Sequence, residues 1–161
     1  MATKGNKNLL KGIPKLKDAF IVIVKTEWNN QFTDLLESAA KEVLEIAKIR
    51  TETLIVPGAV EIPFAIQSHY VHAERSPDAY IALGCVIRGG TPHFEYVCNM
   101  ASRGILNLNL SILKPVIFGV LTLNNEEEAK ERTGGVHGNK GSEAAITAIK
   151  MINLNRKLIK G

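Results

Sequence analysis

Residues 87–95 hold the side chains with the clearest chemical potential in this chain: two adjacent glycines, a Thr-Pro pair and a histidine. Adjacent glycines let backbone N–H groups approach a ligand, and a helix start leaves such donors unpaired, so Gly90 and Thr91 form a candidate anion site. The helix dipole disfavours a protonated imidazole in the first turn, which makes His93 a candidate general acid or base. A simple turn with a surface histidine explains the same residues equally well.

A second glycine-framed loop offers further groups for a phosphate. Lys140 follows Gly138 and Asn139, and Arg132 lies a few residues earlier. A guanidinium suits bidentate phosphate binding. The loop is not a Walker A motif, because Gly141 follows the lysine where that motif has Ser or Thr.

Glu61 and Trp28 each have a functional and a structural interpretation. Glu61 stands in a short turn between Pro57 and Pro63. Its carboxylate can bind hydroxyl groups, or it can simply occupy a helix start that the dipole favours. Trp28, the only tryptophan, precedes the apolar stripe that begins at Phe32. It can stack on a planar ring, although a single tryptophan is more often packed inside a protein.

These loops separate alternating strands and helices. Apolar, β-branched runs typical of buried parallel strands occupy residues 19–24, 51–56, 80–87 and 115–121. Apolar residues at helical spacing occupy residues 32–47, 62–71, 92–108 and 141–157. The alternation predicts a doubly wound α/β sheet, whose ligands bind at the carboxyl ends of the strands. The segments after the predicted strands, residues 25–30, 57–63, 87–94 and 121–140, are therefore the ones expected to carry the site.

Cap residues predict where two of the helices begin. Thr91 is expected to be an N-cap with Pro92 as the first helical residue. Asn124 and Asn125 are expected to cap an acidic turn, and a glycine-rich break at residues 134–138 is expected before the last helix.

Composition narrows the class of protein. The chain has 161 residues, 45% hydrophobic and 22% charged, which suits one packed domain, and no apolar window approaches the length of a membrane span. The first 17 residues contain five lysines and no acid, whereas the rest is nearly neutral. We therefore expect a basic arm over residues 1–17, a single domain over 18–161, and no nucleic-acid or membrane partner. No apolar stretch follows these charges, so a cytoplasmic location is expected.

The two cysteines, Cys85 and Cys98, each lie in an apolar run. Two cysteines make neither a disulfide framework nor a metal site, so both are expected to be reduced and structural.

The motifs together resemble the lumazine synthase family. The resemblance covers Trp28-Asn29 and the segments 56–63, 82–97, 115–122 and 138–145, in the family's order. It implies a three-layer α/β/α fold with a four-stranded parallel, flavodoxin-like sheet. It also implies condensation of 5-amino-6-(D-ribitylamino)uracil with 3,4-dihydroxy-2-butanone 4-phosphate, without metal or organic cofactor, to give 6,7-dimethyl-8-ribityllumazine in riboflavin biosynthesis.

The resemblance also assigns roles by position. It implies that the pyrimidine and its ribityl chain are contacted by Trp28, Asn29, Ala59, Val60, Glu61, Val86 and Ile87. It implies phosphate binding by Gly90, Thr91 and Arg132, proton transfer by His93, and orientation of this histidine by Glu143. A neighbouring subunit is expected to supply Phe118, Arg132 and Lys140.

Assembly follows from the same resemblance. It implies a homopentamer, which we expect to build a sixty-subunit shell, with riboflavin synthase as a possible partner. Three positions depart from the family pattern: Trp28 replaces the common Phe, Val60 replaces Phe or Leu, and Val136 replaces a frequent Lys.

Other classes fit the residues less well. A phosphorelay receiver needs an aspartate after the third strand, and a flavodoxin-like electron carrier needs a phosphate loop after the first; neither is present. The remaining alternative is a catalytically decayed, shell-forming or flavin-binding homologue.

Overall fold

The structure is a computed structural model that describes residues 12–160, without the side chain of Lys160. Four strands form one parallel sheet in the order β2-β1-β3-β4: β1 (Phe20–Thr26), β2 (Arg50–Val56), β3 (Ala79–Ile87) and β4 (Val116–Leu123). The helices are α1 (Asn30–Ile46), α2 (Ile62–His72), α3 (His93–Ser111), α4 (Glu126–Arg132) and α5 (Lys140–Lys160). Most of the predicted basic arm, including Lys4, Lys7 and Lys11, lies outside the described residues.

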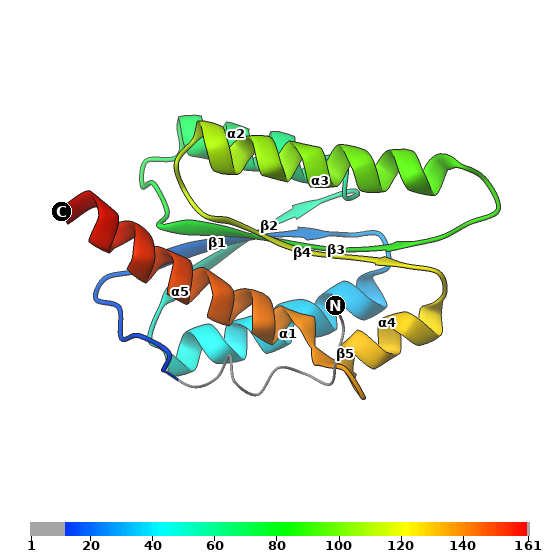
Figure 1. Cartoon of the computed structure of the whole chain (residues 1–161), viewed down its shortest axis with the longest axis horizontal. Helices are drawn as coiled ribbons and strands as arrows, with labels where there is room; N and C mark the ends of the chain where they lie inside the picture. The colour runs from blue at the N-terminus through cyan, green and yellow to red at the C-terminus, as the bar shows by residue number, and fades with distance from the viewer. Residues whose placement is uncertain (1–11, 161) are drawn as a thin grey trace.

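The helices form two layers around the sheet (Figure 1). Helices α2 and α3 cover one face, while α1 and α5 cover the other. Strand β1 explains this arrangement, because Phe20 to Val24 are all buried and alternate between the two cores. The structure thus confirms the predicted three-layer α/β/α fold and its flavodoxin-like strand order. Within residues 12–160, no helix is long and apolar enough to cross a membrane.

The predicted cap of α3 is wrong, whereas the predictions for the start of α4 and for the glycine-rich break are confirmed in part. Helix α3 begins at His93, with Pro92 rather than Thr91 in the N-cap position and no side-chain cap. The break at residues 134–138 is a short antiparallel hairpin of β5 (Thr133–Gly135) and β6 (Gly138–Asn139), and α5 starts directly after it. Of the two asparagines predicted to cap α4, only Asn125 does so, by accepting a hydrogen bond from the backbone N–H of Glu128.

An ion-pair network ties α1 to the sheet at the end of β1. Lys25 Nζ lies 2.6 Å from an Asp34 carboxylate oxygen and 2.7 Å from one of Glu37, and only 11% of the Lys25 side chain is exposed. Glu37 also accepts hydrogen bonds from Lys41 and from the Thr53 hydroxyl on β2. Burial alone would raise the pKa of Glu37, but hydrogen bonds from Lys25, Lys41 and Thr53 outweigh it and lower the pKa to about 2.

This network predicts a pH-dependent loss of stability in Glu37→Gln. When folding lowers the pKa of a carboxyl group, its ionised form stabilises the folded state. This contribution is complete at pH values above the pKa of the unfolded chain, and it disappears as the pH falls toward about 2, the pKa of Glu37 in the folded state. At pH 7 we expect the variant to lose about 1 to 2 kcal/mol of unfolding free energy, allowing for solvent screening. Urea unfolding of wild type and variant at pH 7 and pH 3 measures the difference, which should shrink at the lower pH.

Glu42→Gln is the matched control, because Glu42 is exposed on the same helix and has no ion pair within residues 12–160. A loss in Glu37→Gln that is equal at both pH values, or equal to that of the control, would contradict the assignment.

Candidate active site at the carboxyl edge of the sheet

The four parallel strands end at one edge of the sheet, at the right-hand side of Figure 1. Two backbone hydrogen bonds join the loop after β1 to β2 and the loop that follows it: Glu27 N–H to Val56 O at 2.8 Å and Trp28 N–H to Pro57 O at 3.1 Å. The loops after β1 and β2 are therefore adjacent in space, although about 30 residues separate them in sequence.

Trp28 projects from this edge. Its side chain is 76% exposed, so within one chain it does not pack in the core. The next residue, Asn29, has the left-handed conformation with φ 57°, which asparagine tolerates better than most residues. Its side-chain N–H donates to Cys85 O on β3 at 2.7 Å. This bond links the start of α1 to β3, and among residues 12–160 the side-chain oxygen of Asn29 accepts no hydrogen bond.

The loop after β2 contributes a carboxylate and two apolar residues. Ala59 is buried, Val60 is half-buried and Glu61 is exposed. Glu61 occupies the N-cap position of α2 without a side-chain cap bond. A Cβ built on Gly58 would lie 3.0 Å from a Glu61 carboxylate oxygen, so this carboxylate lies over the glycine. A side chain at position 58 would displace it.

The loop after β3 presents exposed backbone. Val86 and Ile87 are half-buried at the strand end, and Gly90, Thr91 and His93 are exposed. A Cβ built on Gly90 would meet nothing within 4 Å, so this part of the loop faces open space. His93 is the first residue of α3, where the unpaired N–H groups of the helix lie.

Arg88 connects this loop to the start of α3 and to the loop after β4, a role that was not predicted from the sequence. Its guanidinium pairs with Glu95, lies 4.2 Å from the centre of the Phe94 ring, and donates to Asn124 Oδ1 at 3.3 Å. The hydrogen bond from Arg88 lowers the pKa of the Glu95 carboxyl. The only sequence signal for this connection is an arginine and a glutamate on either side of the glycine pair.

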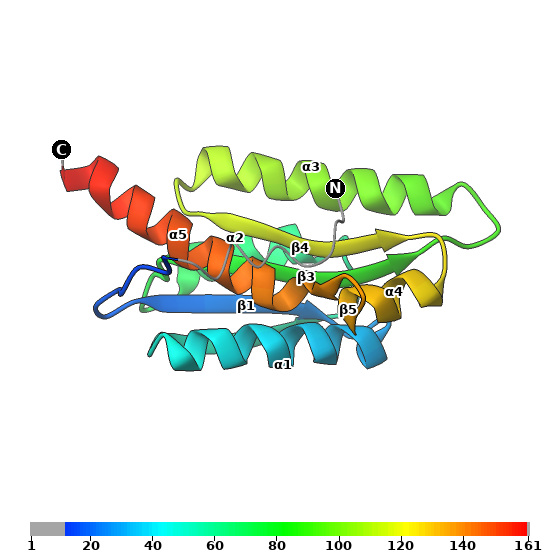
Figure 2. The same cartoon turned by 60° about the horizontal axis from the view of Figure 1, so that its bottom comes forward.

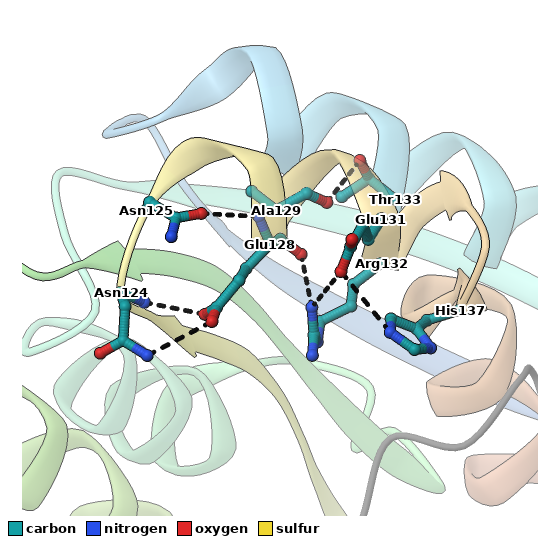
Figure 3. Close-up of polar contacts among 8 residues, drawn as sticks. All are labelled: Asn124, Asn125, Glu128, Ala129, Glu131, Arg132, Thr133 and His137. Carbon is teal, nitrogen blue, oxygen red and sulfur yellow. Dashed lines mark hydrogen bonds and ion pairs between the residues drawn. The ribbon is translucent and has the colours of Figure 1, made fainter.

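Arg132 ends the short helix that follows β4 (Figure 3). Its Nη1 donates to Glu128 O at 2.9 Å and to the Glu131 carboxylate at 3.3 Å. Asn124 donates to the Glu128 carboxylate through its backbone N–H at 2.9 Å, which anchors the start of the same helix. In Figure 2 this helix lies beside the carboxyl ends of β3 and β4.

Phe118, Lys140 and Glu143 lie together at the free edge of β4. They line a hollow of about 400 Å³ between β4 and the start of α5, and Phe118 is 43% exposed. Lys140 Nζ lies 2.7 Å from the Glu143 carboxylate. Glu143 therefore pairs with Lys140 and not with His93 within one chain.

The candidate residues thus form two groups within the described chain. The edge group is Trp28, Asn29, Ala59, Val60, Glu61, Val86, Ile87, Gly90, Thr91 and His93. The β4 group is Phe118, Lys140 and Glu143, and Arg132 ends α4 on the same side of the sheet as α5. Among residues 12–160, no hydrogen bond or ion pair joins His93 to the β4 group or to Arg132.

Cys85 and Cys98 are free thiols in the structure. Burial, with a smaller effect of Glu126, raises the pKa of Cys85 to about 11, so this thiol stays protonated at neutral pH. No group of three potential metal-binding side chains occurs among residues 12–160.

Comparison with known proteins places the chain in a family. The family model described as 6,7-dimethyl-8-ribityllumazine synthase matches residues 18–156. The enzyme of that name from Cytophaga hutchinsonii is 48% identical over 143 residues, which cover 87% of this chain and 89% of the relative. The one from Porphyromonas gingivalis is 45% identical over 89% of this chain and 90% of its own. The one from Flavobacterium johnsoniae is 42% identical over 98% of this chain and 85% of its own length. The chain belongs to the 6,7-dimethyl-8-ribityllumazine synthase family.

Proposed function

We propose that this chain catalyses the condensation of 5-amino-6-(D-ribitylamino)uracil with 3,4-dihydroxy-2-butanone 4-phosphate, a transferase reaction of riboflavin biosynthesis. The products are 6,7-dimethyl-8-ribityllumazine, inorganic phosphate and two waters. The observation that carries the proposal is the family match over residues 18–156, together with the gathering of the motif residues at one edge of the sheet. We expect the reaction to take place in the cytoplasm.

The pyrimidine is proposed to bind among the loops after β1, β2 and β3. Trp28 offers an exposed indole for stacking on the ring, a contact that suits planar heterocycles. The side-chain oxygen of Asn29 and the carboxylate of Glu61 are acceptors for ring N–H groups or ribityl hydroxyls. Backbone groups at Ala59, Val60, Val86 and Ile87 line the remaining edge.

The butanone phosphate is proposed to bind with its phosphate at Gly90, Thr91 and Arg132. The loop supplies exposed backbone N–H groups and the arginine supplies a guanidinium. Joining an amine to a ketone releases water, and phosphate and a second water leave afterwards. Each departure needs a proton to move and a charge to be held, which suits His93 beside an anion site.

Positioning accounts for much of the expected acceleration. Both substrates are already reactive, and holding two reactants in register can contribute about 7 to 11 kcal/mol in well-oriented cases. No metal or organic cofactor is needed for this chemistry. A variant at His93 should therefore be slow but still active.

The complete site is proposed to lie between two subunits of a pentamer. In one chain, Lys140 and Glu143 lie on α5, whereas His93 begins α3 on the opposite face of the sheet. Phe118 and Lys140 of one subunit, with its Arg132, would complete the edge group of the next, and Glu143 would reach His93 across the same boundary. Larger assembly into a sixty-subunit shell, and association with riboflavin synthase, are further parts of this proposal.

The first prediction concerns the reaction and Arg132. The purified protein should form fluorescent lumazine from the two substrates. Arg132→Ala should lose about 2 to 4 kcal/mol of transition-state binding, because it removes a charge-assisted phosphate contact. Steady-state kinetics at varied ketone concentration measure this loss. Unchanged kinetics would refute the role of Arg132, and an assembled wild type without lumazine formation would favour the decayed homologue.

The second prediction concerns Trp28, the only tryptophan. Stacking of the product on its indole should quench the intrinsic fluorescence. Trp28→Ala should weaken product binding by about 1 to 3 kcal/mol, the range for a base stacked on an aromatic side chain. Tryptophan emission that ignores saturating product would show that the indole does not meet the ligand.

The third prediction tests the shared site by complementation. His93→Ala and Arg132→Ala would each impair one half of the site, and the two halves are different. If neighbouring subunits supply these halves, mixed pentamers formed by co-expression should regain up to about a quarter of wild-type activity. Sedimentation should give a mass of five chains or of a multiple of five. The shared site would be contradicted if the mixed pentamers were no more active than the mean of the two separate variants. An active monomer would contradict it too.

A further inference from the structure

Arg132 is held at only one corner of its guanidinium. The Nη1 atom donates to both the Glu128 backbone carbonyl and the Glu131 carboxylate. Within residues 12–160, the Nε and Nη2 atoms have no hydrogen-bond acceptor. The side chain is 19% exposed, and neither atom is among the fully buried polar atoms that lack a partner in residues 12–160, so both donors remain accessible to a ligand. Together they present the paired geometry that a phosphate accepts.

The Glu131 carboxylate is itself held in place by the hairpin that follows α4. His137 Nε2 lies 3.5 Å from the same carboxylate oxygen that accepts from Arg132. The His137 backbone N–H also donates to Glu131 O at 2.9 Å. Figure 3 shows Arg132 and His137 converging on this carboxylate from two sides. Glu131 is thereby restrained at both its backbone and its side chain.

We propose that Glu131 is a positioning residue for phosphate binding. Its carboxylate oxygen, together with the Glu128 carbonyl, sets the plane of the Arg132 guanidinium, so that Nε and Nη2 point toward the phosphate of the ketone. An arginine has many rotamers in solution, and a second fixed acceptor reduces the freedom that must be lost when phosphate binds. The inference rests on the proposed function, because it takes phosphate as the ligand of Arg132.

An electrostatic role and a positioning role of the Glu131 carboxylate predict opposite effects on phosphate binding when the carboxylate is removed. If Glu131 acted through its negative charge, it would oppose an incoming phosphate, and its removal would tighten binding. If it acts as a fixed acceptor, its removal weakens binding, and a neutral acceptor of the same shape can replace it. Glu131→Gln keeps an oxygen at this position without the charge, whereas Glu131→Ala removes the acceptor.

The test compares Glu131→Ala and Glu131→Gln with wild type by steady-state kinetics and by calorimetric titration of inorganic phosphate. We expect Glu131→Ala to raise the KM for the ketone phosphate and the Kd for inorganic phosphate by about fivefold each. The kcat and the KM for the pyrimidine should stay within about twofold, because the contact concerns the phosphate alone. Glu131→Gln should restore most of the phosphate affinity.

Glu127→Ala is the matched control. Glu127 lies on the same helix, is largely exposed and pairs only with Lys130 among residues 12–160. This variant should behave as wild type, and circular dichroism should show intact folding in all variants. The proposal would be overturned if phosphate binding weakened equally in the Ala and Gln variants of Glu131. Tighter phosphate binding in either variant, or a change in kcat alone, would overturn it as well.

The same design separates this inference from the proposed function. If the wild type binds inorganic phosphate but forms no lumazine, the proposed reaction is wrong, and the Kd values of the Glu131 variants still decide the positioning role. If lumazine forms but Glu131→Ala binds phosphate as well as wild type does, the positioning role alone is wrong.

Discussion

Burial of the two central strands on both faces is the constraint on which the other features depend. The side chains of β1 from Phe20 to Val24 alternate between two apolar cores, and those of β3 from Ala79 to Leu83 do the same. Such strands need a layer of helices on each side, and helical crossovers make neighbouring strands parallel. All four strands then end at one edge. The loops that carry the candidate site residues meet there because the core requires this topology.

The rigid sheet alone does not orient the loops, and specific polar contacts complete the arrangement. Asn29 spans from the first loop to Cys85 on β3, and Arg88 connects the glycine loop to Asn124 after β4. The Asn124 backbone N–H in turn donates to the Glu128 carboxylate. The backbone carbonyl of Glu128 then accepts a hydrogen bond from Arg132. A continuous series of hydrogen bonds therefore runs from the glycine loop to the arginine. Small changes along it would move the glycine loop and Arg132 of one chain relative to each other.

The free edge of β4 has a different character from the loop edge. It combines a partly exposed aromatic residue, Phe118, with the Lys140–Glu143 pair beside a hollow. Unpaired strand edges and exposed apolar side chains are costly on an isolated subunit, and a neighbouring chain can cover both. If neighbouring subunits share the site, the contact that covers this strand edge in the assembly would also complete the catalytic site. It would also explain why, among residues 12–160, no hydrogen bond or ion pair joins His93 to the β4 group.

The order of strands and helices, the parallel sheet and the types of residue in each loop could all be predicted from the amino-acid sequence. Apolar periodicity and loop chemistry are local properties, and here they agree with the fold. The partners of the polar groups could not be predicted in this way and become known from the folded chain. Asn29 bonds a strand 56 residues away, Glu143 pairs with Lys140 and not with His93, and the predicted break became the hairpin that restrains Glu131. These contacts depend on which elements become neighbours in space, and periodicity along one segment carries no information about a partner on another.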